Sequence, residues 1–113
     1  ALPIASEQAV LSEMVPLMSA KGFGLLIAVD AEGRLSGIVT DGDLRRHMGP
    51  DLPGRRLSEI MTRAPRTIRA GALATEALEL LNRFKITKLV VVDAERRPGG
   101  LLDIQDVLRH GVA

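Results

Sequence analysis

The sequence predicts an α+β (α/β) fold made of two repeats, each running strand–helix–strand–strand–helix. Three observations support this: an internal repeat, aliphatic runs of strand length, and apolar residues at helical spacing before each run. The chain has 113 residues, of which 46% are hydrophobic and 26% charged, so a packed core is expected. Because a half of about 55 residues buries little surface alone, we expect the repeats to pack sheet against sheet about a pseudo-twofold axis.

The internal repeat has an offset of 63 residues. Residues 26–47 and 89–110 are identical at ten of 22 positions. The offset pairs Asp43 with Asp106, so a polar residue recurs at the same place in each half. We therefore expect two copies of one supersecondary unit.

Each element has its own sequence signal. The first helix of each half shows apolar residues at helical spacing, and the strand that follows is a short aliphatic run typical of a buried strand. A turn beginning with Asp separates that strand from the next one. Short extended segments are expected after Pro3 and Pro65. The other expected elements are helices at 10–18 and 73–81, strands at 25–29, 35–39, 88–92 and 99–102, and closing helices that begin near residues 41 and 103.

Glycine and proline mark the boundary between the halves. Residues 49–54 (Gly-Pro-Asp-Leu-Pro-Gly) are typical of a turn-rich linker. Ser58 is expected to cap a short helix at 57–61. Pro16 is expected to kink or shorten the first helix, because proline lacks the N–H that an interior helical residue donates. The chain thus divides into a first repeat at 1–48, which starts so near residue 1 that we expect it to be clipped, a linker at 49–56, and a second repeat at 57–113.

Composition excludes several classes of function. There is no cysteine and there are two histidines, so no disulfide, metal or cofactor is expected. Lys and Arg number 15 against 14 for Asp and Glu, which argues against a nucleic-acid partner. No apolar run approaches the roughly 18 residues of a membrane span and no secretory signal is visible, so a cytoplasmic location is expected. No set of nucleophile, acid and base is evident, so we expect this chain not to be an enzyme by itself.

A motif at the end of each half resembles a known family. Residues 37–43 (Gly-Ile-Val-Thr-Asp-Gly-Asp) resemble the end of a cystathionine-β-synthase (CBS) motif: glycine, two apolar residues, Thr or Ser, two residues, then Asp. Residues 100–106 repeat the pattern with Asp103 in place of Thr or Ser. The resemblance covers essentially the whole chain and implies one tandem CBS pair. Residues 40–46 and 85–93 resemble more specifically the CBS repeats of arabinose-5-phosphate isomerases, in which the pair follows a sugar isomerase (SIS) domain.

The motif places candidate ligand-binding residues at two strand-to-helix junctions. A Thr40 hydroxyl with the first helix amides can hold a phosphate, and the resemblance implies that Asp43 accepts the two ribose hydroxyls. A plain N-cap threonine with a first-turn aspartate is the structural alternative. Asp106 would hold ribose in a second site. Asp103 would repel a phosphate there, so that site would take a weaker or less charged ligand or none, and Asp103 is otherwise a plain N-cap.

Other positions are implied to surround a base. Thr67 and Ile68 match the extended segment that lines the base pocket in CBS modules, and Ala5 is the approximate counterpart in the first half. Phe23 and Ile86 precede the central strands and would sandwich a base. Core packing is the alternative for both, and is favoured for Ile86.

Two adjacent arginines follow the first motif. Arg45 and Arg46 point to different sides of the helix, so one of them can reach a phosphate or carboxylate with a bidentate fork. The alternative is a solvated last turn that suits the negative end of the helix dipole.

The resemblance implies a regulatory module. Its expected ligand, bound between the repeats, is an adenine nucleotide or a cytidine monophosphate (CMP) sugar. The CMP sugar would be an end product of the lipopolysaccharide pathway that the family's isomerase feeds. The expected partners are the SIS domain of the same polypeptide and a second copy of the chain, in a homodimer or higher homo-oligomer. The alternative is a structural dimerisation or oligomerisation module with degenerate ligand sites.

Overall fold

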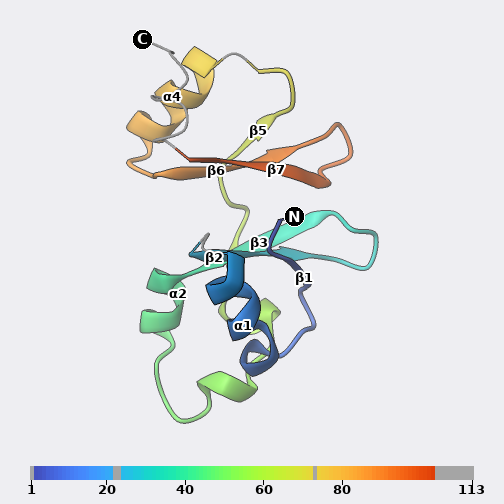
Figure 1. Ribbon diagram of the computed structural model, residues 1–113, viewed down its shortest axis with the longest axis vertical. Helices are drawn as coiled ribbons and strands as arrows, with labels where there is room; N and C mark the ends of the chain where they lie inside the picture. Colours follow the sequence, from blue (N-terminus) through green and yellow to red (C-terminus); the bar gives the residue numbers. More distant parts are fainter. Residues whose placement is uncertain (1, 22–23, 73, 104–113) are drawn as a thin grey trace. The chain divides into compact units, whose positions relative to one another are not determined.

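The computed structural model describes residues 2–21, 24–72 and 74–103 (Figure 1). It divides into two compact units between Pro65 and Arg66. Each unit contains one small β-sheet with at least one helix against it, which confirms the α+β class and its division into two related halves.

The first unit is built on a four-stranded sheet in the order β1-β2-β3-β4. Strand β1 pairs parallel with β2, and the chain crosses from one strand to the other through the helix α1 (Leu11–Lys21). Strand β2 then pairs antiparallel with β3, and β3 with β4. The sequence did not predict β4, since two residues carry no periodicity. The strands are β1 (Ile4–Ser6), β2 (Leu25–Val29), β3 (Leu35–Thr40) and β4 (Thr62–Arg63).

Helix α1 continues through Pro16, so the expected shortening of this helix was wrong. Pro16 is exposed, whereas Leu11, Met14 and Leu17 of the same helix pack into the core of the unit. This apolar face offsets the backbone hydrogen bond that proline cannot make.

The short helix α3 (Leu57–Ile60) lies where the sequence predicts it, but Ser58 does not cap it. Backbone carbonyl groups near β1 accept hydrogen bonds from its first amides. Leu57 N donates to Ala9 O at 2.9 Å and Ser58 N to Glu7 O at 2.8 Å. Because these bonds satisfy the free amides of the first turn, no capping hydroxyl is required.

Helices of the first unit cover one face of its sheet and bury an apolar cluster against it (Figure 1). Besides α1 and α3, the 3₁₀ helix η1 (Leu52–Gly54) contributes to this core. Residues 57–61 therefore pack in the first unit. The buried members of the cluster are Ala5, Leu11, Leu26, Ala28, Val39, Leu52, Leu57, Ile60 and Met61.

The second unit repeats the design with a three-stranded sheet in the order β5-β6-β7. Strand β5 (Thr67–Arg69) pairs parallel with β6 (Lys88–Val92), and β6 antiparallel with β7 (Pro98–Asp103). Helix α4 (Ala74–Arg83) connects β5 to β6 and packs on the sheet through Ala77 and other apolar side chains. The helix expected after residue 103 lies outside the described residues.

Among the described residues of the second unit, two positions hold a left-handed backbone without glycine. Lys85 has φ 53° and follows α4; its N–H donates to Asn82 O, and Ile86 N–H donates to Leu81 O. This pattern is a Schellman motif, whose left-handed position usually carries glycine. Arg96, in the β6–β7 turn, has φ 64°.

Candidate functional site

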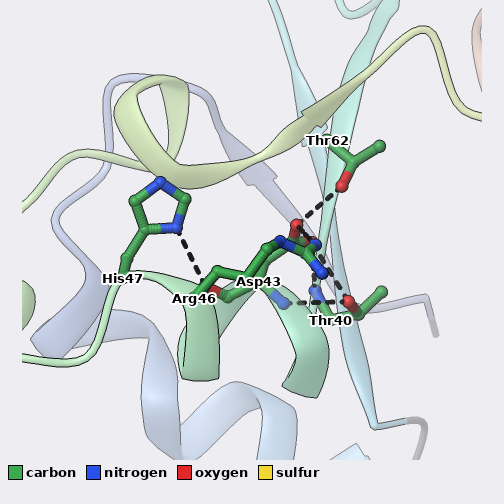
Figure 2. Close-up of polar contacts among 5 residues, drawn as sticks. All are labelled: Thr40, Asp43, Arg46, His47 and Thr62. Atoms are coloured by element: carbon green, nitrogen blue, oxygen red, sulfur yellow. Dashed lines mark hydrogen bonds and ion pairs between the residues drawn. The ribbon is translucent and has the colours of Figure 1, made fainter.

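The carboxylate of Asp43 is the buried polar centre of the first unit (Figure 2). Asp43 lies in the first turn of α2 (Asp41–Arg46), immediately after β3, and is 2% exposed. Its Oδ2 accepts hydrogen bonds from Thr40 N at 2.9 Å and Thr40 Oγ1 at 3.1 Å. Its Oδ1 accepts from Thr62 Oγ1 at 2.6 Å and from Arg46 Nη2. One buried carboxylate is therefore satisfied by three residues from three segments.

Local capping places Thr40 and Asp43 together. Thr40 ends β3 in an extended conformation and is the N-cap of α2. Its hydroxyl oxygen accepts from Asp43 N at 3.3 Å, while the Asp43 carboxylate accepts from Thr40 N. This reciprocal arrangement is a capping box. The structural alternative offered by the sequence is thus present, and any ligand contact would be added to it.

The glycine of the motif brings Thr62 to the carboxylate. Gly37 of β3 faces Arg63 of β4 in the sheet. A Cβ atom at Gly37 would lie 2.6 Å from Met61 Sδ and 2.8 Å from the Thr62 carbonyl oxygen. Contacts below 3.0 Å would push β4 away, so glycine is what allows this close approach. Gly37 therefore lets the Thr62 hydroxyl reach Asp43.

The charge of Asp43 is set by two opposing effects. Burial by itself raises the pKa of this carboxyl group. Hydrogen bonds from the Thr62 hydroxyl, the Thr40 amide, the Arg46 guanidinium and the Thr40 hydroxyl together outweigh burial and lower the pKa below 3.8. Asp43 is therefore ionised at neutral pH and is a weak base. This chemistry suits accepting hydroxyl hydrogen bonds better than taking a proton.

The basic residues at the end of α2, Arg45, Arg46 and His47, differ in the contacts that they make. Arg46, not Arg45, contacts the Asp43 carboxylate, with 63% of its side chain exposed. Arg45 is exposed and makes no ion pair within the described part of the chain. Nδ1 of His47, the C-cap residue of α2, lies 2.9 Å from the backbone oxygen of Asp43 (Figure 2).

At the position equivalent to Thr40, the second repeat has Asp103, which forms an ion pair. Asp103 faces Lys88 across β6 and β7, and Lys88 Nζ lies 3.4 Å from Asp103 Oδ2. In the first unit the equivalent facing pair is Thr40 and the buried Leu25. Asp103 in place of Thr40 and Lys88 in place of Leu25 therefore neutralise each other's charge. Asp106 lies outside the described residues.

The residues expected near a base have mixed surroundings. Ile68 is buried in the core of the second unit, and Ile86 packs against the same cluster. Thr67 is half-buried, on the neighbouring position of β5. Ala5 is in the core of the first unit. Phe23 lies outside the described residues. Their roles toward a ligand stay predictions.

Sequence reasoning missed Thr62. The offset of 63 residues takes this position beyond the chain, so the repeat offers no partner for it. The contact with Asp43 spans 19 residues and depends on a two-residue strand. Only the glycine of the motif hinted that another backbone passes close to β3.

Two classes of site are absent from the described residues. No three acidic or histidine side chains in the described ranges gather where they could hold a metal ion. Among the same residues, no helix has the length and apolar character needed to cross a membrane.

These features define a class of protein: a tandem α+β repeat with a buried, hydrogen-bonded aspartate at a strand-to-helix junction. The family model described as CBS domain matches residues 2–49 and 57–113. The chain belongs to the CBS domain family and is a tandem CBS pair, which confirms the resemblance. The second match begins at residue 57, whereas the compact units divide between Pro65 and Arg66.

Similar proteins agree with this assignment. Arabinose 5-phosphate isomerase KdsD of Pseudomonas aeruginosa is 46% identical over 97 residues, covering 84% of this chain and 30% of the isomerase. The chain spans about a third of the length of the curated relatives that it matches.

Solved structures show the same fold. The cytosolic domain of the Mg²⁺ channel MgtE, in complex with ATP, superposes with a TM-score of 0.83 at 25% identity. The alignment covers 97% of this chain and 45% of that one. CBSX2, in complex with AMP, gives a TM-score of 0.81 at 24% identity, covering 96% of this chain and 86% of that one.

Proposed function

We propose that this CBS pair is a regulatory module that binds a nucleotide or nucleotide sugar through Asp43 and Thr40. The observation that carries the proposal is the buried Asp43 carboxylate, ionised and positioned in the first turn of a helix that follows a strand. A ribose offers two neighbouring hydroxyl donors, which match a carboxylate held in one orientation. Solved relatives of the same fold carry ATP and AMP, which supports an adenine nucleotide as one candidate.

The relatives also support a parent activity. Because curated relatives are arabinose 5-phosphate isomerases, we propose that the chain works in the same polypeptide as an SIS isomerase domain. A CMP sugar, as an end product, is then the second candidate ligand. Regulation requires that the ligand bind two states of the enzyme unequally, with a coupling of about 1–3 kcal/mol. Assaying isomerisation of arabinose 5-phosphate by the whole gene product, with and without each nucleotide, tests this part.

Ligand binding is tested by calorimetry on the chain. AMP, ATP, CMP and a CMP sugar would be titrated into the wild-type chain, Asp43→Ala and Asp41→Asn. Asp41 is exposed in the same helical turn and serves as the matched control. We expect one ligand to bind the wild-type chain and Asp41→Asn equally and to lose at least tenfold in affinity for Asp43→Ala, since a charged hydrogen-bond acceptor is removed (about 1.5–3 kcal/mol). Equal affinity for all three proteins would contradict the role of Asp43.

A second candidate function is assembly without a ligand. It is favoured by a specific observation: donors within the protein already satisfy both Asp43 oxygens, and the second repeat has an ion pair in place of Thr40. In this case Asp43 stabilises the fold only. Light scattering coupled to size exclusion would show a homodimer or larger oligomer that no nucleotide changes.

A further inference from the structure

The two oxygens of the Asp43 carboxylate have different partners. Oδ2 is held by Thr40, the residue that caps the same helix. Oδ1 is held from outside that cap, by the Thr62 hydroxyl at 2.6 Å and by Arg46. A ribose diol that binds Asp43 without unfolding the start of α2 must therefore use Oδ1.

The partners of Oδ1 differ in what they anchor. Arg46 and Thr62 are both exposed, but Arg46 lies on α2 itself, so water can replace its contact without freeing another segment. Thr62 belongs to β4, which joins the sheet through two register pairs with β3. Its hydroxyl is the side-chain link between this two-residue strand and α2. Losing that bond weakens the hold on β4.

The chain leaves the first unit directly after β4. Ala64 follows with a left-handed φ of 51°, although it is not glycine, and Pro65 is the last residue of the unit. A non-glycine residue in this region stores strain that the surrounding structure must hold. Arg63 Nη2 adds one bond to Ser58 O at 3.1 Å. Residues 62–65 are thus a strained connection held at one end by Thr62.

We infer that Asp43 is a latch: its Oδ1 holds β4 through the Thr62 hydroxyl, and a ribose diol that takes Oδ1 releases β4 and the connection between the repeats. The release of β4 by a ribose rests on the proposed function, whereas the holding of β4 by the Asp43–Thr62 bond does not. Thr62 then sets ligand affinity by competing with the ligand, and residues 62–65 change whenever the site is filled.

The test uses Thr62→Val, with Thr62→Ser as its matched control. Valine keeps the branched shape that suits a strand but cannot donate, and serine keeps the hydroxyl. Hydrogen exchange of the amides of residues 62–64 would be measured without ligand and with saturating AMP. AMP affinity would be measured by calorimetry, with 2′,3′-dideoxy-AMP as the ligand that lacks the diol.

Without ligand, we expect Thr62→Val to exchange these amides about tenfold faster than the wild-type chain, and Thr62→Ser to match the wild-type chain. AMP should produce the same acceleration in the wild-type chain. Thr62→Val should bind AMP about tenfold more tightly, since no internal donor has to be displaced, and this gain should vanish with the dideoxy nucleotide.

The outcomes distinguish the latch formed by Asp43 and Thr62 from the binding of AMP at Asp43. Unchanged exchange in Thr62→Val overturns the latch, whatever AMP does. Faster exchange in Thr62→Val together with no AMP binding by any variant supports the latch and contradicts AMP as the ligand. Faster exchange with equal AMP affinity for the wild-type chain and Thr62→Val shows that the ligand leaves Thr62 in place, which overturns its release by the ligand.

Discussion

Asp43→Asn removes one charge from the centre of the first unit while keeping the shape of the side chain. Asparagine retains one acceptor oxygen and replaces the other with an NH₂ group, which can only donate. The donors around Asp43 are Thr40 on one oxygen and Thr62 with Arg46 on the other. If the NH₂ group faces Thr40, it meets the Thr40 amide donor; if it faces the other side, it meets the Arg46 guanidinium, whereas the Thr62 hydroxyl can turn and accept from it.

The expected loss of stability follows from these contacts. Hydrogen bonds to a charged group contribute about 1.5–3 kcal/mol each. Arg46 is 63% exposed, so water screens its ion pair and its share is small. The loss then comes mainly from Thr40 and Thr62, whose hydrogen bonds to a charged acceptor are replaced by weaker bonds to a neutral amide. We expect Asp43→Asn to lower the free energy of unfolding by about 2–3 kcal/mol at pH 7.

Urea denaturation followed by circular dichroism measures this difference, with Asp41→Asn as the control. The pKa of Asp43 is lowered in the folded protein, so its stabilisation is complete above the unfolded value of 3.8 and is lost as the pH falls through the folded pKa. The difference between the wild-type chain and Asp43→Asn should therefore be constant from about pH 5 to 8, decrease as the pH falls below 3.8, and vanish only below the pKa of the folded protein. A loss under about 0.5 kcal/mol at pH 7 would refute the reasoning.

Two further substitutions test the backbone. Gly37→Ala places a Cβ 2.6 Å from Met61 Sδ and should destabilise the chain by about 2–3 kcal/mol in urea denaturation. Gly100→Ala, whose nearest contact is 3.4 Å, is its matched control, and an equal loss in both would contradict the close-approach argument. Lys85→Gly relieves a left-handed φ of 53° and should raise the free energy of unfolding by about 1 kcal/mol. Thermal denaturation would show this as a higher midpoint, and a lower midpoint would count against it.

Local sequence patterns predicted most of the fold. The runs rich in aliphatic residues at 25–29 and 88–92 correspond residue for residue to β2 and β6, because a strand buried on both faces consists mostly of apolar residues. The repeat predicted that the two halves share one order of elements, and Thr40 was recognised as a candidate cap for α2. Such signals operate within a few residues, where propensity, periodicity and capping are decided.

The candidate site was predicted only in part by the sequence. Thr40 and Asp43 were evident, because three residues separate a cap from its partner. That Arg46 rather than Arg45 reaches Asp43 follows from helical spacing, since Arg46 is three residues further along the same helix. That Asp43 is buried and that Thr62 binds it are decided by the tertiary structure. The Thr62 contact depends on where β4 lies against β3, and this is fixed by a long-range packing contact at Gly37 for which a two-residue strand carries no local signal.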